Sequence, residues 1–269
     1  MVVIIKTALI VSTYNAPEKL SCVLKHISFN CTLPDEIIVA DDGSAEECKW
    51  AIEDWISKLP LKHIWHEDEG FRKCRILNES LKQIDCDYVI FLDGDCLPHR
   101  HFVRDHITLA ETGFFVQGRR CFIPEKEVAS VIGGKKSIKQ LILTGKISGY
   151  FKSLRFPRPI IIRNMAQRGL IGCNWSAWKK DLIDVNGFDE DYEGWGIGED
   201  SDICSRLYNL GIIRKFVYGR SVVYHMNHPE SCKVHLDSSK ERLRCTIYSG
   251  KTRCMNGLSK FPNCNQHEN

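Results

Sequence analysis

The segment Val89–Arg100 reads VIFLDGDCLPHR, and it decides the fold. Together with Tyr88 before it, the segment opens with five largely apolar residues (88–92). They predict a buried strand, which ends at once in Asp93 and Asp95 with a single glycine between them. Two carboxylates at the tip of a buried strand can hold a divalent cation whose other ligands are phosphate oxygens and water. The alternative is a plain Asp-Gly turn after a strand, without a metal. The surrounding sequence has to decide between the two interpretations.

Strands and helices alternate through the first half of the chain. Apolar runs closed by polar residues predict strands at 7–15 (TALIVSTYN), 36–44 (EIIVADDGS), 61–67 (LKHIWHE) and 88–95 (YVIFLDGD). Helical spacing of apolar residues predicts helices at 16–29, 45–59 and 73–84. Alternation with continuous apolar strands is typical of an α/β fold, in which helices cover both faces of a mostly parallel sheet.

Three of these strands end in polar or acidic clusters: STYN (12–15), DDGS (41–44) and DGD (93–95). The carboxyl ends of parallel strands meet at one edge of a sheet, and ligands bind there. We therefore expect the three clusters to form one site.

The second half departs from this rhythm. Residues 130–170 carry nine Lys or Arg residues and no Asp or Glu, and we expect a mobile or subdomain-like insertion there instead of more sheet. A strand before a short helix KKDLIDV, a glycine-rich loop, a helix after GEDSD and a strand GRSVVYHMNH follow. The tail from Pro229 is expected to form a helix and then a loosely held end.

Two histidines near the end of the last strand could complete a metal site with Asp95. His225 and His228 are three residues apart, and imidazole suits Mn²⁺ as well as Zn²⁺. Isolated histidines at a strand end are otherwise ordinary surface or hydrogen-bonding residues. The acid pair elsewhere in the chain favours the metal interpretation.

A general base is expected at the start of a helix. Glu199 and Asp200 follow the glycine-rich stretch EGWGIG, and a carboxylate there could accept a proton from a sugar hydroxyl. Acids at a helix start are commonly only caps, and Asp202 with Arg206 at helical spacing is interpreted in that way. A helix cap requires neither Trp195 nor the glycines, so their presence favours a functional role for Glu199 and Asp200 over capping.

The motifs STYN, DDGS, EGFRKCRILN, LDGD, NGFDEDYEGWGIGED and YHMNH, in this order, resemble an inverting, metal-dependent glycosyltransferase of family 2. The second half is similar to the C-terminal part of β-1,4-galactosyltransferases and chondroitin-type polymerases. The resemblance covers about residues 7–228. It implies the GT-A fold, a mostly parallel Rossmann-like sheet flanked by helices, with a C-terminal acceptor-binding half.

The resemblance also implies a role for each matched residue. Asp200 would be the catalytic base and Glu199 would grip the acceptor or donor sugar, with Mn²⁺ or Mg²⁺ on Asp95, His225 and His228. The acceptor would contact Trp195, Asn174 and Trp175. The UDP-sugar donor would be held by Ser12, Thr13, Tyr14, Asn15, Asp42, Arg72, Arg75, Asn78 and Asp93.

The basic segment is expected to concern the acceptor. Its apolar residues interleave with lysines and arginines, a mix suited to an anionic membrane surface or a lipid-linked diphosphate. A solvated basic face is the alternative, and no nucleic-acid motif accompanies the charge. We expect four regions: a nucleotide-sugar-binding half (1–118), the basic insertion (119–170), an acceptor and catalytic half (171–228) and a C-terminal tail (229–269).

The function expected is the transfer of a hexose or N-acetylhexosamine to a lipid-linked saccharide in bacterial surface-polysaccharide synthesis, such as lipopolysaccharide, O-antigen or capsule. Two other classes stay open: a sugar nucleotidyltransferase, and a non-catalytic nucleotide- or carbohydrate-binding module. The first would normally show a glycine-rich N-terminal loop with a basic residue, which LIVSTYNAPEKL lacks. The second has no need for Asp200.

Composition and targeting signals indicate a cytoplasmic protein, with peripheral contact to the inner membrane through the basic segment. The 13 cysteines are scattered without a CxxC pair, which favours reduced thiols. The apolar N-terminus lacks the basic region and cleavage site of a signal peptide, and no window reaches the length of a membrane-spanning helix. The net charge of +3 excludes no class of partner.

Overall fold

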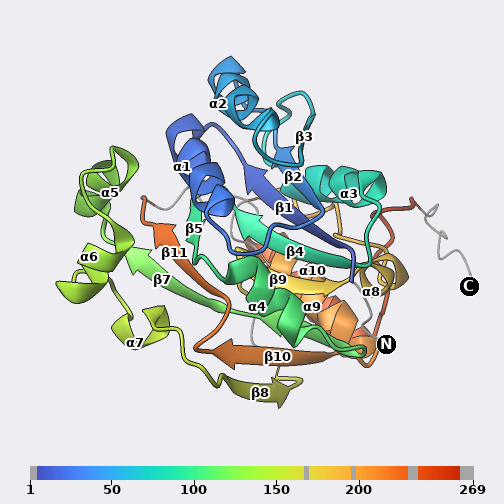
Figure 1. Ribbon diagram of the computed structural model, residues 1–269. Coiled ribbons are helices and arrows are strands. Elements are labelled where there is room, and N and C mark those ends of the chain that lie inside the picture. Colours follow the sequence, from blue (N-terminus) through green and yellow to red (C-terminus); the bar gives the residue numbers. More distant parts are fainter. Residues whose placement is uncertain (1–4, 167–169, 195–197, 230–235, 261–269) are drawn as a thin grey trace, which may run out of the picture.

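The computed structural model describes residues 5–166, 170–194, 198–229 and 236–260. Its strands form two sheets, one of eight strands and one of three (Figure 1). The large sheet has the order β3-β2-β1-β4-β9-β6-β10-β8, and the small sheet has the order β5-β11-β7. The strands are β1 (Thr7–Thr13), β2 (Glu36–Asp41), β3 (Leu61–Trp65), β4 (Tyr88–Asp93), β5 (Cys96–Pro98), β6 (Phe114–Gln117), β7 (Arg119–Ile123), β8 (Ile160–Asn164), β9 (Asn174–Trp178), β10 (Ile213–Tyr218) and β11 (Val222–Met226).

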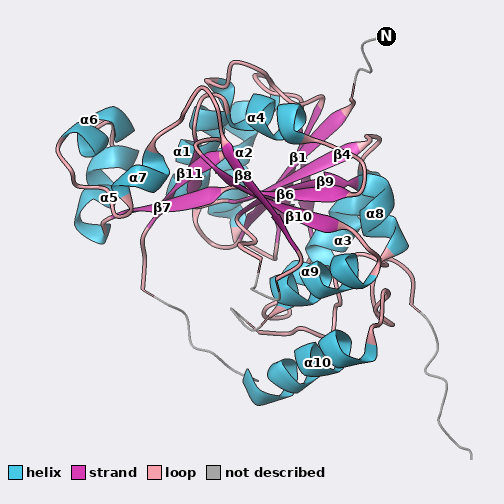
Figure 2. Cartoon of the chain, turned by 90° about the horizontal axis from the view of Figure 1, so that it is seen from below, coloured by secondary structure: helices cyan, strands magenta, loops and turns pink. Residues whose placement is uncertain are grey.

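The helices cover both faces of the large sheet, as Figure 2 shows from below. Helices α1, α2 and α4 lie on one side of the strands, and α3, α8 and α9 lie on the other. The helices are α1 (Pro17–Ser28), α2 (Glu46–Ile56), α3 (Lys73–Gln83), α4 (Phe102–Leu109), α5 (Glu125–Ile132), α6 (Ile138–Leu143), α7 (Tyr150–Ser153), α8 (Lys179–Asp184), α9 (Glu199–Asn209) and α10 (Leu236–Ser249). The predicted α/β fold is confirmed.

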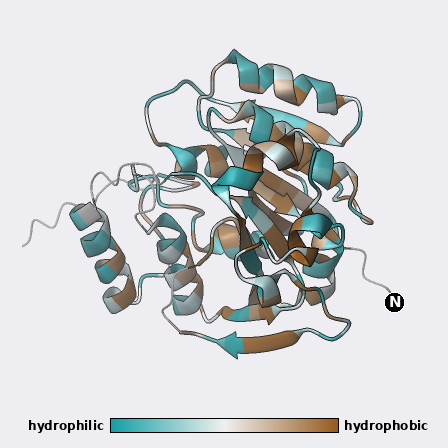
Figure 3. Cartoon of the chain, turned by 90° about the vertical axis from the view of Figure 1, so that its left-hand side faces the viewer, coloured by the Kyte–Doolittle hydropathy of each residue, from teal (hydrophilic) through white to brown (hydrophobic). Residues whose placement is uncertain are grey.

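Alternating side chains of the central strands explain the two layers. In β1, Leu9 and Val11 belong to the apolar cluster under α1, whereas Ala8 and Ile10 belong to the cluster under α3 and α9. Successive side chains of a strand point to opposite faces, so a strand buried on both sides must be apolar throughout. Figure 3 shows the hydrophobic colour gathered in the central strands, with mixed colours on the helices.

The sheet is parallel where the sequence alternates most regularly. Strands β1, β2, β3 and β4 run parallel, and β6 pairs in parallel with β10. Between these two groups, β9 runs antiparallel to both β4 and β6. The first residue of β9, Asn174, therefore lies at the same edge of the sheet as the last residues of β4.

The expectation of no further sheet in residues 130–170 is wrong at β8, which lies within them. Strand β7 pairs with β11 in the small sheet, and β8 forms the edge of the large sheet against β10. Between them, α5, α6 and α7 form a helical excursion beside the small sheet (Figure 1). Strand β8 (IIIRN) was missed because its side chains are largely exposed and only its antiparallel pairing with β10 makes it part of the sheet.

The elements predicted after residue 170 are confirmed: β9, α8, α9, β11 and a helix in the tail, α10. No helix in the described part of the chain is long and apolar enough to cross a membrane. The cysteines of the described residues form no disulfide bond with one another.

A buried ion pair fastens α9 to its neighbours. Asp202 and Arg206 are each 1% exposed and lie 2.7 Å apart, and the guanidinium also donates to the carbonyls of Val185 and Gly187. Thr246 of α10 donates to the second oxygen of Asp202. The pair predicted as a simple helix cap is therefore a junction of three elements.

We predict that Arg206→Ala lowers the free energy of unfolding by about 3–5 kcal/mol, because it leaves the Asp202 carboxylate buried without its cation. Urea denaturation followed by circular dichroism measures this loss. The matched control is Lys180→Ala, which removes an exposed pair of the same helical spacing with Asp184 and should cost less than about 1 kcal/mol. Equal costs for both variants would contradict the prediction.

Candidate active site

The site lies at the edge where β1, β2 and β4 end. Ser12 near the end of β1 pairs in register with Asp93 at the end of β4, and Thr13 pairs with Asp41 at the end of β2. The polar clusters predicted to meet at one edge therefore do so, and we refer to this edge as the acidic rim. Asp95 follows two residues after β4.

Asp95, His225 and His228 form the first cluster at the acidic rim. The Nε2 atoms of His225 and His228 lie 3.2 Å and 3.0 Å from the same carboxylate oxygen of Asp95. One ligand atom from each residue lies within 4.8 Å of the other two. One carboxylate oxygen and two imidazole nitrogens are a donor set that suits Mn²⁺, so these residues fit a divalent metal.

The electrostatics of this cluster favour a cation. Burial alone would raise the pKa of Asp95, but the hydrogen bonds with His225 and then His228 lower it below its usual range. The bond to Asp95 raises the pKa of His228 in return. Asp95 is therefore ionised at neutral pH and offers a full negative charge.

Lys73, Asp93, Glu199 and Asp200 form a second cluster. Nζ of Lys73 lies 2.8 Å from Asp93 Oδ1, and the Ser12 hydroxyl donates to the same oxygen at 2.8 Å. Ser12, Lys73, Asp93 and Asp200 line one small cavity with Gly172. Lys73 was not singled out in the sequence, although a lysine at the start of a helix that follows a polar loop was the available signal.

The environment of Asp200 raises its pKa to about 8. Burial is the main cause, and the nearby charge of Glu199 adds to it, while Lys73 and the backbone N–H of Gly172 act in the opposite direction. A Cβ at position 172 would clash with the Asp200 carboxylate, so a glycine is required for the backbone to approach this closely. Asp200 is thus poised to exchange a proton near neutral pH.

Residues 12–15 close one side of the rim. The Tyr14 hydroxyl donates to Asp68 at 3.0 Å and its ring is half exposed. Asn15 has φ +44° and braces the next loop, because its amide oxygen accepts from Ala45 N and its own N–H donates to Ser44. The Thr13 hydroxyl is buried and has no hydrogen-bond partner among the described residues.

Asp42 organises the neighbouring side. Its carboxylate accepts from the Arg72 backbone N–H at 3.0 Å and lies 2.8 Å from His66 Nε2. Burial raises the pKa of Asp42, against these two hydrogen bonds. The side chain of Arg72 lies 3.6 Å from Glu193, and Arg75 pairs with Glu69 at 3.0 Å. Both arginines therefore remain near the rim at a partly exposed surface.

Three predicted contacts are corrected by the structure. The amide of Asn78 is fully buried and bonds the backbone of Phe188 in both directions, which leaves it to support the loop at 188 and not the donor. Trp175 is 1% exposed and stacks on Phe91 in the core, so it does not offer its ring to an acceptor.

Asn174 is also fully buried, and its amide bonds His106 and the carbonyls of Arg119 and Ser221. Its polar atoms are used within the protein and not for the acceptor. Trp195 lies outside the described residues.

Family comparisons match most of the chain. The model of the family "Glycosyl transferase family 2" matches residues 8–170, and that of "N-terminal domain of galactosyltransferase" matches residues 163–229. The chain is 28% identical to a chondroitin synthase of Escherichia coli over 243 residues, which are 82% of this chain and 35% of that protein. It is 27% identical to a hyaluronan synthase of Pasteurella multocida over 240 residues, 82% of this chain and 24% of that protein. The chain thus spans about a quarter to a third of the length of these relatives.

Solved structures share the fold. Residues covering 91% of this chain superpose on S. aureus TarS 1-349 in complex with UDP, with a TM-score of 0.65, 16% identity and 65% of that chain covered. The mannosyltransferase PcManGT from Pyrobaculum calidifontis, in complex with GDP-Man and Mn²⁺, has a TM-score of 0.57 and 17% identity, with 91% of this chain and 63% of that chain covered.

We predict that His225→Ala and His228→Ala each weaken Mn²⁺ binding by at least about tenfold, because even the loss of an outer partner of a metal ligand costs about 10–100-fold. Calorimetric titration with MnCl₂ measures this. His101→Ala serves as the control, since this histidine pairs with Cys31 instead. Unchanged Mn²⁺ affinity in both cluster variants would rule out this metal site.

Proposed function

Because this chain belongs to glycosyl transferase family 2, we propose that it transfers a hexose or N-acetylhexosamine from a UDP-sugar to a saccharide acceptor. The observation that carries the proposal is the presence of two distinct acidic clusters at one rim. Asp95 is ionised and paired with two imidazoles, whereas Asp200 has a pKa near 8. The first suits a cation and the second suits proton transfer.

The donor binds along the ends of β1 and β2. Ser12, Thr13, Tyr14 and Asn15 line one side of the nucleotide, and Asp42, Arg72 and Arg75 line the other. The unpartnered hydroxyl of Thr13 and the half-exposed ring of Tyr14 support this placement. A relative of the same fold is described in complex with UDP, which supports a uridine nucleotide.

Asp95, His225 and His228 hold Mn²⁺ or Mg²⁺. When bound, the ion neutralises the charge of the leaving diphosphate as a Lewis acid. The donor set of the cluster supports this assignment, as does the Mn²⁺ named for the mannosyltransferase of the same fold. Asp93, held by Ser12 and Lys73, contacts the ribose and diphosphate side of the donor.

Asp200 takes the proton of the acceptor hydroxyl, which attacks the anomeric carbon from the face opposite UDP. Inversion of an α-linked donor then gives a β-glycosidic bond, with no covalent enzyme intermediate. Glu199 grips a sugar and raises the pKa of Asp200, and Lys73 limits that rise. Lys73 is therefore a positioning residue that keeps the base in its useful range.

The acceptor is a lipid-linked saccharide of a bacterial surface polysaccharide, such as lipopolysaccharide, O-antigen or capsule. Relatives named as chondroitin and hyaluronan synthases support a role in polysaccharide assembly. Residues 1–118 bind the nucleotide-sugar, 119–170 face the acceptor and the membrane, 171–228 carry the catalytic half, and 229–269 form a tail. Exposed Leu143 and Phe151 beside lysines support peripheral contact with the cytoplasmic face of the inner membrane.

The purified protein is expected to release UDP slowly from one member of a panel of UDP-sugars in Mn²⁺, and to stop when EDTA is added. Release of UDP measured by a coupled assay names the donor sugar and tests the metal together. Calorimetry with each UDP-sugar is the second measurement, because a strict acceptor requirement can hide the hydrolysis. Failure of every UDP-sugar both to react and to bind would overturn the proposed function.

The pH dependence of kcat/KM is expected to reveal Asp200. The base works only when deprotonated, so the rate rises with pH through its pKa. Removing the negative neighbour in Glu199→Gln lowers that pKa and moves the rise to lower pH, whereas removing the cation in Lys73→Met moves the rise to higher pH. Donor turnover measured from pH 5 to 10, a range chosen to bracket about pH 8, reports both midpoints.

Asp200→Asn should abolish this pH dependence and lower the rate by about 10²–10⁴-fold, the usual contribution of a general base. Asp184→Asn, a carboxylate paired with Lys180 on α8, is the matched control and should leave the profile unchanged. Midpoints that stay fixed in both neighbour variants would exclude Asp200 as the base.

A further inference from the structure

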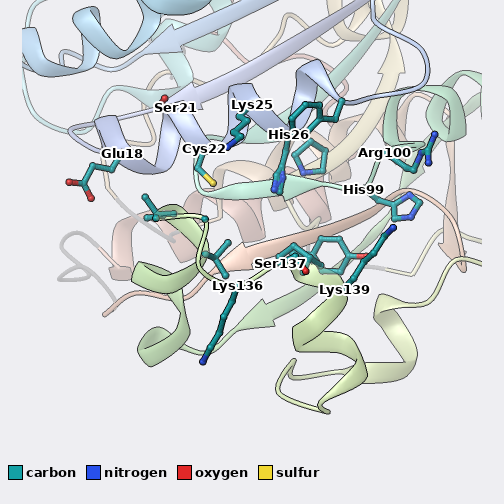
Figure 4. A pocket seen from close by; sticks show the side chains of 18 of the residues that line it. Glu18, Ser21, Cys22, Lys25, His26, His99, Arg100, Lys136, Ser137 and Lys139 are labelled. Atoms are coloured by element: carbon teal, nitrogen blue, oxygen red, sulfur yellow. The ribbon is translucent and has the colours of Figure 1, made fainter.

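A groove outside the acidic rim runs between α1 and the helical excursion α5–α7 (Figure 4). Its volume is about 1450 Å³, large beside the roughly 300–1000 Å³ of an ordinary small-molecule pocket. Helix α1 forms one wall, α5 and α6 form the other, and the loop after β5 closes it with His99 and Arg100. None of the residues assigned to the donor, the metal or the base lines it.

One end of the groove adjoins the acidic rim. Pro17 and Glu18, which line that end, are separated from Asn15 of the rim by Ala16 alone. From there the 12 residues of α1 carry the groove about 18 Å away, to Phe29.

The wall formed by the helical excursion is largely aliphatic. Val131, Ile132, Ile138, Ile142 and Leu154 line it, and Phe29 contributes a ring that is 63% exposed at the far end. Aliphatic side chains offer no hydrogen bonds to sugar hydroxyls, whereas they gain free energy by covering a hydrocarbon chain. This wall therefore favours a lipid over a polysaccharide.

Some of the cationic side chains that line the groove form no ion pair among the described residues. Lys25 of α1, Arg100 and Lys139 of α6 line the groove and make no ion pair within the part of the chain that the structure describes. Two further cations of the lining differ, because Lys136 pairs with Glu127 and Arg155 pairs with Asp105.

Two histidines of the groove lining are uncharged. Burial, followed by the nearby Lys25, lowers the pKa of His26 to about 4. Burial likewise lowers the pKa of His99 to about 4. The nearby Arg155 and Arg100 lower it further, whereas Asp105 acts to raise it. Both histidines are neutral at pH 7, so the positive charges of the groove lining are those of its lysines and arginines, against the carboxylates of Glu18 and Asp54.

We propose that this groove binds the lipid phosphate of a lipid-linked acceptor, with the hydrocarbon chain on the aliphatic wall and the phosphate between Lys25, Arg100 and Lys139. Figure 4 shows Lys25 and Arg100 on one side of the groove and Lys139 on the other. The saccharide end then extends along α1 to Asp200 at the rim. This inference rests on the proposed function, whose acceptor it places.

The test uses farnesyl diphosphate as a short prenyl diphosphate, titrated by calorimetry into the 269-residue chain with EDTA. The chelator excludes metal-dependent binding of the diphosphate at Asp95. The double variant Lys25→Glu/Lys139→Glu should bind at least about tenfold more weakly, because it reverses two charges that face the phosphate. Inorganic diphosphate and farnesol, each carrying half of the probe, should also bind at least about tenfold more weakly than farnesyl diphosphate.

The matched control is Lys126→Glu/Lys135→Glu, which reverses two exposed charges of the same segment outside the groove lining. It should bind farnesyl diphosphate as the unmodified chain does. Both double variants should bind the UDP-sugar with Mn²⁺ normally, so a folding defect is recognised. If the unmodified chain itself does not bind the UDP-sugar, that result counts against the proposed function and not against the groove.

Three results would overturn the inference. The first is no binding of farnesyl diphosphate, and the second is an equal loss in the two double variants. The third is that farnesyl diphosphate does not bind, whereas an anionic oligosaccharide or phosphatidylglycerol vesicles do. Their binding would have to weaken when Lys25 and Lys139 are replaced. The third result would assign the groove to a polysaccharide or to the membrane surface.

Discussion

The side-chain amide of Asn174 joins the two sheets, and the geometry of the site depends on this junction. Asn174 lies at the start of β9, beside β4. Its amide donates to the carbonyl of Arg119, the first residue of β7, and to that of Ser221, the residue before β11. Its oxygen faces His106, whose pKa burial lowers to about 4. The same small sheet sets the metal cluster, because β5 pairs with β11 so that Cys96 lies opposite His225 and the Met226 N–H donates to the Asp95 carbonyl. Asn174 ties this sheet to β4, which leads to Asp95, and so holds together residues that are 130 positions apart in sequence.

The two acidic clusters at the rim differ in the groups that face each carboxylate. Two imidazoles and a thiol surround Asp95, and its pKa falls although the side chain is largely buried. Asp200 faces Glu199 and Asp93 as well as Lys73, and its pKa rises. Carboxylates of the same chemistry are thereby separated into a permanent anion and a group that exchanges protons, which is the usual way in which one site supports two tasks.

Charge is also divided across the molecule. Anionic side chains gather at the rim, where Mn²⁺ or Mg²⁺ would offset them, and the groove beside α1 is lined by cations of which Lys25, Arg100 and Lys139 form no ion pair among the described residues. An extended acceptor that is neutral at its sugar end and anionic at its lipid end would match this order along α1. The helical excursion α5–α7 supplies the aliphatic wall, so the segment that departs from the alternating pattern is the one that distinguishes this fold from a bare nucleotide-binding sheet.

The sequence by itself determined the parallel core and the acidic rim. A strand buried on both faces must be apolar throughout and must become polar where it leaves the core, so β1, β2 and β4, with Asp93 and Asp95, can be recognised locally. Tertiary structure alone decided which polar residues are free to act. Asn78 and Asn174 look like ligand contacts in sequence, yet they bond backbone groups up to 110 residues away, and Lys73 becomes important only because folding brings it to Asp93. The physical reason is that burial and hydrogen-bond satisfaction depend on partners distant in sequence, whereas hydrophobic periodicity is a property of neighbours.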